Sequence, residues 1–394
     1  MSVKRKEKFI SIVGRIDLGV AYTLLKVFLV TLLCYVFTQR AQALIGYEDA
    51  IFPEPIASAR ALAIGNAYVA GANDSNAVYY NPAGLGSVKW FHLHLENFAF
   101  EVNKNLGRMG AGGNLRNASS NFSRITNMEG IRQVLSVNRD TIYHSRYQFF
   151  PNITSRFFSL GYMYSKKTRA IIGKDPPDGT KAQFEYAGRT DHGPVAAINL
   201  SVMGGIFKLG ASATLLNRSE VKGEQDYDVS FEKTEENSYK GVSLYGVIGS
   251  KLTLPVRFLP TFAGKMNNAF RQRFRKTGGI DSPDYIKPSV DVGFSITPQI
   301  GKTSRIHLEV NYRDMYLEHK DVASSRRIGF GMEIDLARRF HIRGGYADGF
   351  GSGGIGIKTK PLEVDITSYS VDLTNDRYKG KEDRRFMFSL SAGI

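Results

Sequence analysis

The stretch SARALAIGNAYVAGANDSNAVYYNPAGLG, residues 58–86, decides how the rest of the chain is interpreted. It is rich in Ala, Gly and Asn, and its only charged residues are Arg60 and Asp74. It follows a candidate export signal and precedes many segments in which apolar and polar residues alternate. A small-residue element of this kind, nearly neutral and with adjacent tyrosines at 79 and 80, could lie inside another structure.

The local signals within this stretch predict one short helix followed by a reversal. Asp74 or Ser75 can cap a helix over residues 76–79, because their side chains accept hydrogen bonds from the free N–H groups of a first turn. We expect the helix to end at Asn81, since the proline that follows disfavours the α region for the residue before it. The Ala-Gly pair at 83–84 then allows a tight turn.

The same stretch resembles the N-terminal region of FadL-type outer-membrane proteins. The resemblance rests on Ala-Arg-Ala-Leu at 59–62, on Asn-Asp-Ser at 73–75 and on an Asn-Pro-Ala-Gly motif. That superfamily includes long-chain fatty-acid transporters and the PorV-type barrels of secretion systems. The resemblance implies an antiparallel barrel of about 14 strands, an even number as is usual for bacterial barrels, with the stretch as a plug inside it. It assigns the plug turn to Asn81, Pro82, Ala83 and Gly84.

Length and composition are compatible with one large barrel or with two or three soluble domains. The 394 residues are 42% hydrophobic, and their mean hydropathy is −0.22. A helical membrane bundle needs several long apolar runs, so this composition excludes one. A transmembrane barrel stays possible, because only alternate residues of its strands face lipid. The 40 glycines, 20 tyrosines and 25 phenylalanines fit barrel turns and aromatic girdles.

The N-terminus has the composition of an export signal. Four basic residues within positions 4–8 precede an apolar run at 27–37, and Ala-Gln-Ala at 41–43 fits a cleavage site. We therefore expect residues 1–43 to be a signal peptide and the mature chain to begin at Leu44. An uncleaved anchor over 18–37 is the alternative, although Lys26 divides that span.

Cysteine usage and charge narrow the classes of partner. The single cysteine, Cys34, lies in the expected signal, so the mature chain would hold no disulfide and no cysteine metal site. Residues 1–43 contain seven basic and two acidic side chains, so +10 of the total net charge of +15 belongs to the remainder. The basic residues are scattered and no nucleic-acid-binding motif is present. Anionic lipid head groups or a merely basic surface explain the charge better than nucleic acid does.

Period-two alternation dominates the C-terminal half and predicts strands with one apolar face. It runs through residues 306–312, 328–336, 340–346 and 386–394. Charged residues occupy successive positions on the other face, as in Arg305, His307 and Glu309. Such a face must be wet, and the lumen of a barrel supplies water.

Two segments interrupt this pattern. Residues 103–140 form a long polar stretch in which Ile125, Met128, Arg132 and Leu135 have helical spacing, which predicts a loop with a small helix. In residues 258–276, phenylalanine or methionine recurs every fourth position, which predicts a basic amphipathic helix. That helix would lie on the membrane surface or pack its phenylalanines on the barrel rim.

No motif for catalysis or for binding a cofactor is present. His92 and His94 share a strand face, but no third ligand stands near them, so we interpret them as polar lumen residues rather than a metal site. Asp191 and His192 are neighbours on a strand and should point to opposite faces. There is no G-x-S-x-G or H-E-x-x-H sequence. We expect no catalytic residue, no metal and no cofactor, and therefore no enzyme.

The prediction is thus an all-β protein: a signal peptide at 1–43, a plug at 44–88 and a transmembrane barrel at 89–394 in the bacterial outer membrane. What the resemblance implies is uptake or capture of hydrophobic small molecules such as long-chain fatty acids. The alternative is a PorV-like docking or shuttle component that transports nothing. A barrel hydrolase is a third interpretation.

The expected partners follow from these interpretations. They are outer-membrane lipids, a hydrophobic small-molecule ligand and an envelope protein, with no nucleic acid. For the plug, we add Tyr79 and Tyr80 as candidate contacts with the lumen wall; the alternative is that they only pack within the plug. No carboxylate site can be assigned, because lumen arginines such as Arg305 and Arg343 look alike in the sequence.

Overall fold

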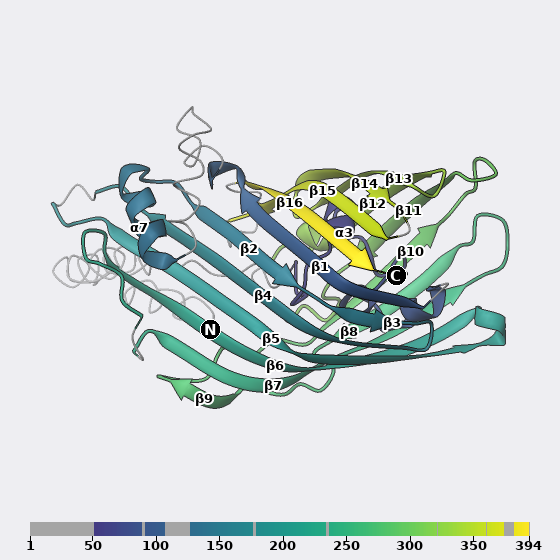
Figure 1. Cartoon of the computed structure of the whole chain (residues 1–394), viewed down its shortest axis with the longest axis horizontal. Coiled ribbons are helices and arrows are strands. Elements are labelled where there is room, and N and C mark those ends of the chain that lie inside the picture. The colour runs from purple at the N-terminus through teal and green to yellow at the C-terminus, as the bar shows by residue number, and fades with distance from the viewer. Residues whose placement is uncertain are drawn as a thin grey trace, which may run out of the picture. The chain divides into compact units, whose positions relative to one another are not determined.

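The computed structural model describes residues 51–88, 91–106, 127–175, 179–233, 236–320, 322–359, 361–373 and 382–393. Within them, all strands belong to one antiparallel sheet that closes on itself, because β1 pairs with β16 (Figure 1). The 16 strands make a barrel of 14, since β2 and β3 lie end to end between the same neighbours, and β8 and β9 both pair with β7. The all-β barrel of about 14 strands is confirmed.

The elements follow in chain order around this barrel. The strands are β1 His92–Asn103, β2 Tyr143–Phe149, β3 Asn152–Thr154, β4 Phe158–Ile172, β5 Gln183–Val202, β6 Phe207–Asp226, β7 Ser238–Thr253, β8 Thr261–Asn267, β9 Arg275–Gly279, β10 Ser289–Ile296, β11 Arg305–Tyr312, β12 Ile328–Leu336, β13 Phe340–Ala347, β14 Phe350–Lys358, β15 Leu362–Asp372 and β16 Glu382–Gly393. The helices are α3 Ala59–Ala63, α4 Ala77–Tyr80 and α7 Met128–Val137, with 3₁₀ turns η1 Pro82–Ser87, η2 Met203–Gly205 and η3 Ser324–Arg327.

Side chains on the two faces of the wall differ as the alternation predicts. On β11, Glu309 is buried in the lumen with His307 beside it, whereas Leu308 and Val310 are 38% and 42% exposed on the outside. The exterior is therefore an apolar band and the interior is polar. A closed barrel with this exterior spans a lipid bilayer, since every strand edge is paired and the outward side chains match hydrocarbon.

One edge of the apolar band, at the end of the barrel opposite the start of β1, can be located from strand register. Outward positions 207–215 of β6 are all Phe, Leu or Ala, and Asn217 is the first polar one. Asn217 pairs with His192 on one side and with Val242 on the other, and Tyr164 pairs with His192. We call Tyr164, His192, Asn217 and Val242 the boundary row. A polar and aromatic row of this kind is typical of a membrane–water interface.

The two ends of the barrel have different connections. At the end that holds the start of β1 and the end of β16, successive strands are joined by three to eight residues. At the other end the connections are longer, up to residues 104–142, apart from the two-residue turn between β13 and β14. Bacterial outer-membrane barrels have short periplasmic turns and long extracellular loops. The end that holds the start of β1 and the end of β16 is therefore periplasmic.

Residues 51–88, which we call the inner segment, lie in the lumen. None of them is exposed. Their apolar side chains share one cluster with inward residues of the wall such as Phe150, Leu216 and Val247. The predicted short helix is present as α4, residues 77–80, and its C-cap is Asn81 as predicted. Its N-cap is Asn76 rather than Asp74 or Ser75, and the Asp74 side chain instead accepts a hydrogen bond from Asn76 N in the turn before the helix.

The prediction of a helix over residues 258–276 is wrong. Residues 261–267 form β8 and residues 275–279 form β9, both paired with β7. A spacing of four residues fits one face of a helix, but it also fits one face of a strand, because four is a multiple of two. Pairing with neighbouring strands decides whether such a segment forms a helix or a strand. Phe262 faces outward and is 51% exposed, whereas Phe274 is buried in the lumen cluster.

The small helix predicted in the long loop is confirmed. Met128, Arg132 and Leu135 lie in α7, whereas Ile125 lies outside the described residues. The helix is capped by the side chain of Asn127 and packs on residues of β2, β4 and β5 near the extracellular end (Figure 1). The predicted signal peptide, residues 1–43, lies outside the described residues.

Among the helices that the structure describes, none is long enough and apolar enough to cross a lipid bilayer.

Candidate functional site

Polar side chains from around the wall bind the inner segment. Most of these hydrogen bonds go to backbone groups of the segment, which its short helices leave without partners. The donors and acceptors on the wall are Gln148 of β2, Ser212 of β6, Lys251 of β7, Asn311 of β11, Ser352 of β14 and Thr367 of β15. The polar face that the alternation predicted therefore contacts protein over much of its surface.

Two carboxylates of the wall also bind the inner segment. Glu309 accepts hydrogen bonds of 2.7 Å from the N–H groups of Ala70 and Gly71. Glu333 accepts two hydrogen bonds of 2.7 Å from Arg60, whose guanidinium forms a bidentate pair with it. A bidentate Arg–carboxylate pair fixes orientation as well as distance. Both contacts hold the inner segment to β11 and β12.

Glu54 is the centre of a buried ion cluster whose partners come from β8, β10 and the connection after β11. Its Oε1 lies 2.6 Å from Lys265 Nζ and 3.3 Å from Arg313 Nη1, and Lys265 also lies 3.5 Å from Asp291. Burial alone would raise the pKa of Glu54, but Lys265 and Arg313 outweigh it and lower the pKa to about 2. The carboxyl is therefore ionised and pins the start of the inner segment to β8.

The Asn-Pro-Ala-Gly motif forms the turn between α4 and η1. Asn81 Oδ1 accepts from Ala83 N at 3.1 Å, and its Nδ2 donates to Val69 O at 2.9 Å and to Ser250 O at 3.2 Å. One buried amide thus closes the turn, ties it to the rest of the inner segment and ties it to β7. Pro82 begins η1, where its missing N–H costs nothing.

Asn81→Ala should destabilise the barrel by about 2–3 kcal/mol, because it leaves buried partners of the amide unsatisfied. Asn76→Ala is the matched control, since the Asn76 side chain makes no capping hydrogen bond and the change should cost about 0.5 kcal/mol or less. Urea unfolding in detergent micelles, followed by circular dichroism, measures both. Equal losses for the two variants would contradict this role for Asn81.

Tyr79 and Tyr80 are both fully buried and lie against different surroundings. The Tyr79 ring lies 5.8 Å from the Phe150 ring, and its hydroxyl accepts from Thr214 at 3.4 Å. The Tyr80 hydroxyl accepts from Ser58 N, and Lys265 Nζ lies 5.4 Å from its ring. Burial raises the pKa of both hydroxyls, so both stay protonated donors.

Glycines let the wall approach the backbone of the inner segment. A Cβ placed on Gly345 would lie 2.2 Å from Gly65 N and 2.2 Å from Ile64 C. One placed on Gly210 would lie 2.2 Å from Pro82 C. Any larger residue at these positions collides with backbone. The wall and the inner segment therefore fit together because these wall positions are glycines and have no side chain.

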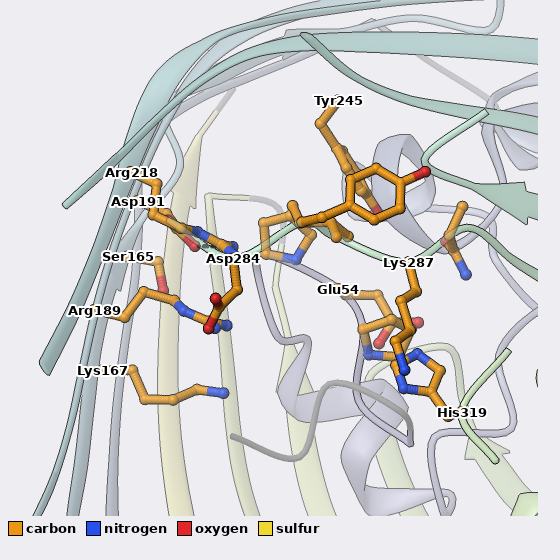
Figure 2. Close-up of a pocket in the computed structure, with 15 residues that line it drawn as sticks. Glu54, Ser165, Lys167, Arg189, Asp191, Arg218, Tyr245, Asp284, Lys287 and His319 are labelled. Atoms are coloured by element: carbon orange, nitrogen blue, oxygen red, sulfur yellow. Dashed lines mark hydrogen bonds and ion pairs between the residues drawn. The ribbon is translucent and has the colours of Figure 1, made fainter. Parts of the chain in front are cut away.

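A cavity of about 120 Å³ remains between the inner segment and the extracellular loops. Lys167, Arg189 and Arg218 enter it from β4, β5 and β6, and Lys287 and His319 lie on the opposite side (Figure 2). Its other lining residues are Pro53, Glu54, Pro55, Ser165, Asp191, Tyr245, Asn267, Asp284, Tyr285 and Ile286. Cationic groups and apolar surface therefore meet in one small space.

Several of the charges that line the cavity are already paired. Arg218 makes two hydrogen bonds of 2.7 and 2.8 Å to Asp191, and Arg189 lies 2.6 Å from Glu220. Tyr245 differs, because its hydroxyl is buried and lacks a hydrogen-bond partner among the described residues. A buried hydroxyl without a partner is costly. The wall of the cavity therefore holds paired charges beside one buried hydroxyl whose hydrogen-bonding capacity is unused.

Sequence reasoning missed this cavity and most of the residues that anchor the inner segment. Glu54 and Lys265 are 211 residues apart, and no local pattern connects them. Arg343 was recognised as a lumen residue, and it lies 2.7 Å from Glu333. The expected separation of Asp191 and His192 is confirmed: Asp191 faces Arg218, whereas His192 binds the Tyr162 hydroxyl on the outside.

No protein-family model matches the chain, and no curated protein matches its sequence. Solved structures do match. The monoaromatic hydrocarbon channel TodX, a protein of P. putida, is 10% identical in its deltaS2 mutant form, covering 86% of this chain and 99% of its own, with a TM-score of 0.51. The toluene transporter TbuX of Ralstonia pickettii is 11% identical, covering 87% of this chain and 99% of its own, with a TM-score of 0.46.

The likeness to TodX concerns the fold. It supports the closed antiparallel β-barrel fold that the sequence predicted. Together with the apolar exterior, it places the protein in the bacterial outer membrane.

Proposed function

We propose that this barrel captures an apolar small molecule that carries an anionic group, such as a long-chain fatty acid, and takes it up across the outer membrane. The cavity beside the inner segment carries this proposal. It combines Lys167, Arg189 and Lys287 with the apolar surfaces of Tyr285 and Ile286, on the extracellular side of the inner segment. A bound carboxylate would gain from the cations, while an apolar chain would cover the aromatic and aliphatic surface.

In this proposal the inner segment acts as a plug. It fills the lumen and is bound to the wall around its circumference, so a guest passes only if the segment moves or the wall parts at a kink. The fold supports transport by analogy, because TodX, which shares it, is described as a hydrocarbon channel.

Tyr245→Phe tests the cavity. Removing the hydroxyl should leave stability unchanged or raise it slightly, because that hydroxyl lacks a partner in the described part of the chain. If the hydroxyl binds the ligand, the amount of co-purified fatty acid should fall several-fold. Organic extraction of the purified barrel, followed by mass spectrometry, measures the ligand, and thermal unfolding measures stability. Unchanged ligand content in Tyr245→Phe would contradict this assignment.

Locking the inner segment tests the plug. A Cβ on Gly293 would lie 3.1 Å from the Val69 Cβ, close to the separation of about 3.5–4.5 Å found in disulfides. The double variant Val69→Cys and Gly293→Cys should therefore form a disulfide, and only Cys34, in the expected signal, could compete. We expect uptake of labelled oleate into proteoliposomes to fall at least tenfold on oxidation and to return on reduction.

The two single cysteine variants are the controls, and neither should respond to oxidation. Equal uptake by the oxidised and reduced double variant would show that the segment need not move.

A second function, docking of an envelope protein without transport, is favoured by one observation. The inner segment leaves a cavity of only about 120 Å³ on its extracellular side, and the wall holds it by ion pairs as well as hydrogen bonds. A barrel that takes up no oleate in either redox state and instead co-purifies with an envelope protein would support docking and overturn the transport proposal.

A further inference from the structure

A group of basic side chains lies at the extracellular edge of the apolar band, away from the lumen cavity. Arg271 and Arg273 lie in the connection between β8 and β9, Arg275 begins β9, and Lys240 lies on the adjacent strand β7. The three arginines are exposed and Lys240 is partly exposed. We call these four residues the basic group.

Strand register places the basic group at the depth of lipid head groups. Arg275 pairs with Val242, which belongs to the boundary row, and Lys240 pairs with Gly278 two positions further toward the extracellular end. Residues on the membrane side of this row are apolar, such as Ile248 and Phe262, which are 49% and 51% exposed. The positive charges thus begin where the hydrocarbon-facing surface ends.

The basic group is electrostatically uncompensated. At this end of the barrel other basic residues are paired with carboxylates, namely Arg139 with Asp175, Lys181 with Asp228 and Lys222 with Asp284. In the part of the chain that the structure describes, no member of the basic group forms an ion pair. Arg273 lies over the Tyr285 ring, at 5.8 Å. Four positive charges close together favour an anionic partner.

An apolar surface continues from the basic group toward the membrane centre. The Phe270 ring lies over Gly246 of β7, since a Cβ there would be 2.4 Å from it, and Phe270 is 44% exposed. Phe262 and Phe294 stack next to each other, with ring centroids 4.9 Å apart. The positive charges lie at the membrane surface and the apolar strip lies deeper in the membrane. This arrangement matches a lipid, which has its phosphate at the surface and its acyl chains in the membrane interior.

We propose that the basic group binds the phosphate groups of an outer-leaflet membrane lipid whose acyl chains lie along Phe270, Ile248 and Phe262. Arginine pairs with phosphate through two parallel hydrogen bonds, and cationic residues beside a bilayer attract anionic head groups. This site lies on the outside of the wall and is independent of the transport proposed for the lumen.

The test is a lipid titration of the full barrel in a non-ionic detergent, read by native mass spectrometry. The probe is diphosphorylated lipid A, compared with lipid A of the same acylation but without phosphate. The test variant carries Arg271→Gln, Arg273→Gln, Arg275→Gln and Lys240→Gln. The matched control also loses four positive charges, at the periplasmic turns, through Arg156→Gln, Arg257→Gln, Arg338→Gln and Arg339→Gln.

We expect the test variant to bind diphosphorylated lipid A about tenfold more weakly or worse, and the control variant to bind it like the unmodified protein. Heat-modifiable migration in gels confirms that each variant is folded. Equal weakening by both variants would show a general charge effect and overturn the site. Binding that needs no lipid phosphate, or that inorganic pyrophosphate displaces fully at equal concentration, would also overturn it.

Discussion

Gly345→Val should release the inner segment from the wall or prevent the barrel from closing around it. A Cβ at this position would lie 2.2 Å from two backbone atoms of residues 64–65, and backbone on both sides leaves no flexible end to move away. Overpacking of a tight core costs about 1–3 kcal/mol and sometimes more, and the three carbon atoms that valine adds here belong at the upper end.

The neighbouring Gly344 supplies the matched control. It faces outward, and a Cβ there would meet nothing within 4 Å. Gly344→Val should therefore leave stability within about 0.5 kcal/mol of the unmodified protein. Limited proteolysis of the folded barrel reports whether residues 51–88 have become accessible, and urea unfolding reports the energy. A Gly345→Val barrel that unfolds like Gly344→Val and protects the segment would contradict the close approach.

Glu54→Gln should be the most destabilising change of a single polar side chain. It leaves the buried cations Lys265 and Arg313 without their shared carboxylate, and breaking a buried ion pair from one side costs about 3–5 kcal/mol. Lys265→Met in the same chain should recover part of the loss, because it removes one of the buried charges. The free energy of urea unfolding at pH 7 measures all three proteins.

The control for this prediction is an ion pair on the protein surface in which the nitrogen and oxygen are the same distance apart. Lys181 and Asp228 are also 2.6 Å apart, but their side chains are 57% and 42% exposed. Asp228→Asn should destabilise the protein far less than Glu54→Gln, because water and side-chain entropy offset an exposed ion pair. If Asp228→Asn and Glu54→Gln destabilise equally, burial is not what makes the Glu54 cluster strong.

The stabilisation from Glu54 should also depend on pH with a defined sign. The folded protein lowers the pKa of this carboxyl from 4.5 to about 2, so folding is favoured when the group is ionised. Its contribution, about 3 kcal/mol by linkage, is complete above pH 4.5 and is lost as the pH falls toward 2. The stability difference between the unmodified protein and Glu54→Gln should therefore shrink between pH 5 and pH 2.5. A difference that stays constant over this range would contradict the low pKa.

Residues 58–86 show which features of the fold can be predicted from residues that are close in sequence. Their small residues and nearly neutral composition predicted a compact element, and the order of Asn81 and Pro82 predicted where α4 ends. Capping and proline effects act within a few residues, so they can be read from one sequence. The alternation on β11 and β12 likewise predicted which side chains face the lumen, because strand geometry assigns neighbours to opposite faces.

Residues 258–276 show where such reading fails. A period of four is common to one helical face and one strand face, so the phenylalanine spacing could not distinguish them. Pairing with β7 and β10 made residues 261–267 a strand, and β7 took residues 275–279 as its second partner. Strand pairing is non-local and depends on partners that sequence periodicity does not name.

The sequence by itself determined the class of fold and the polar and apolar faces of the wall. Only the tertiary structure decided what those faces contact. Closing the barrel brought Glu54 to Lys265, Arg60 to Glu333, and Gly345 to the backbone of residues 64–65. These partners lie hundreds of residues apart, and their contacts depend on strand register and on the depth at which the inner segment sits. Register and depth are set by the whole closed sheet, so no segment of the chain carries them alone.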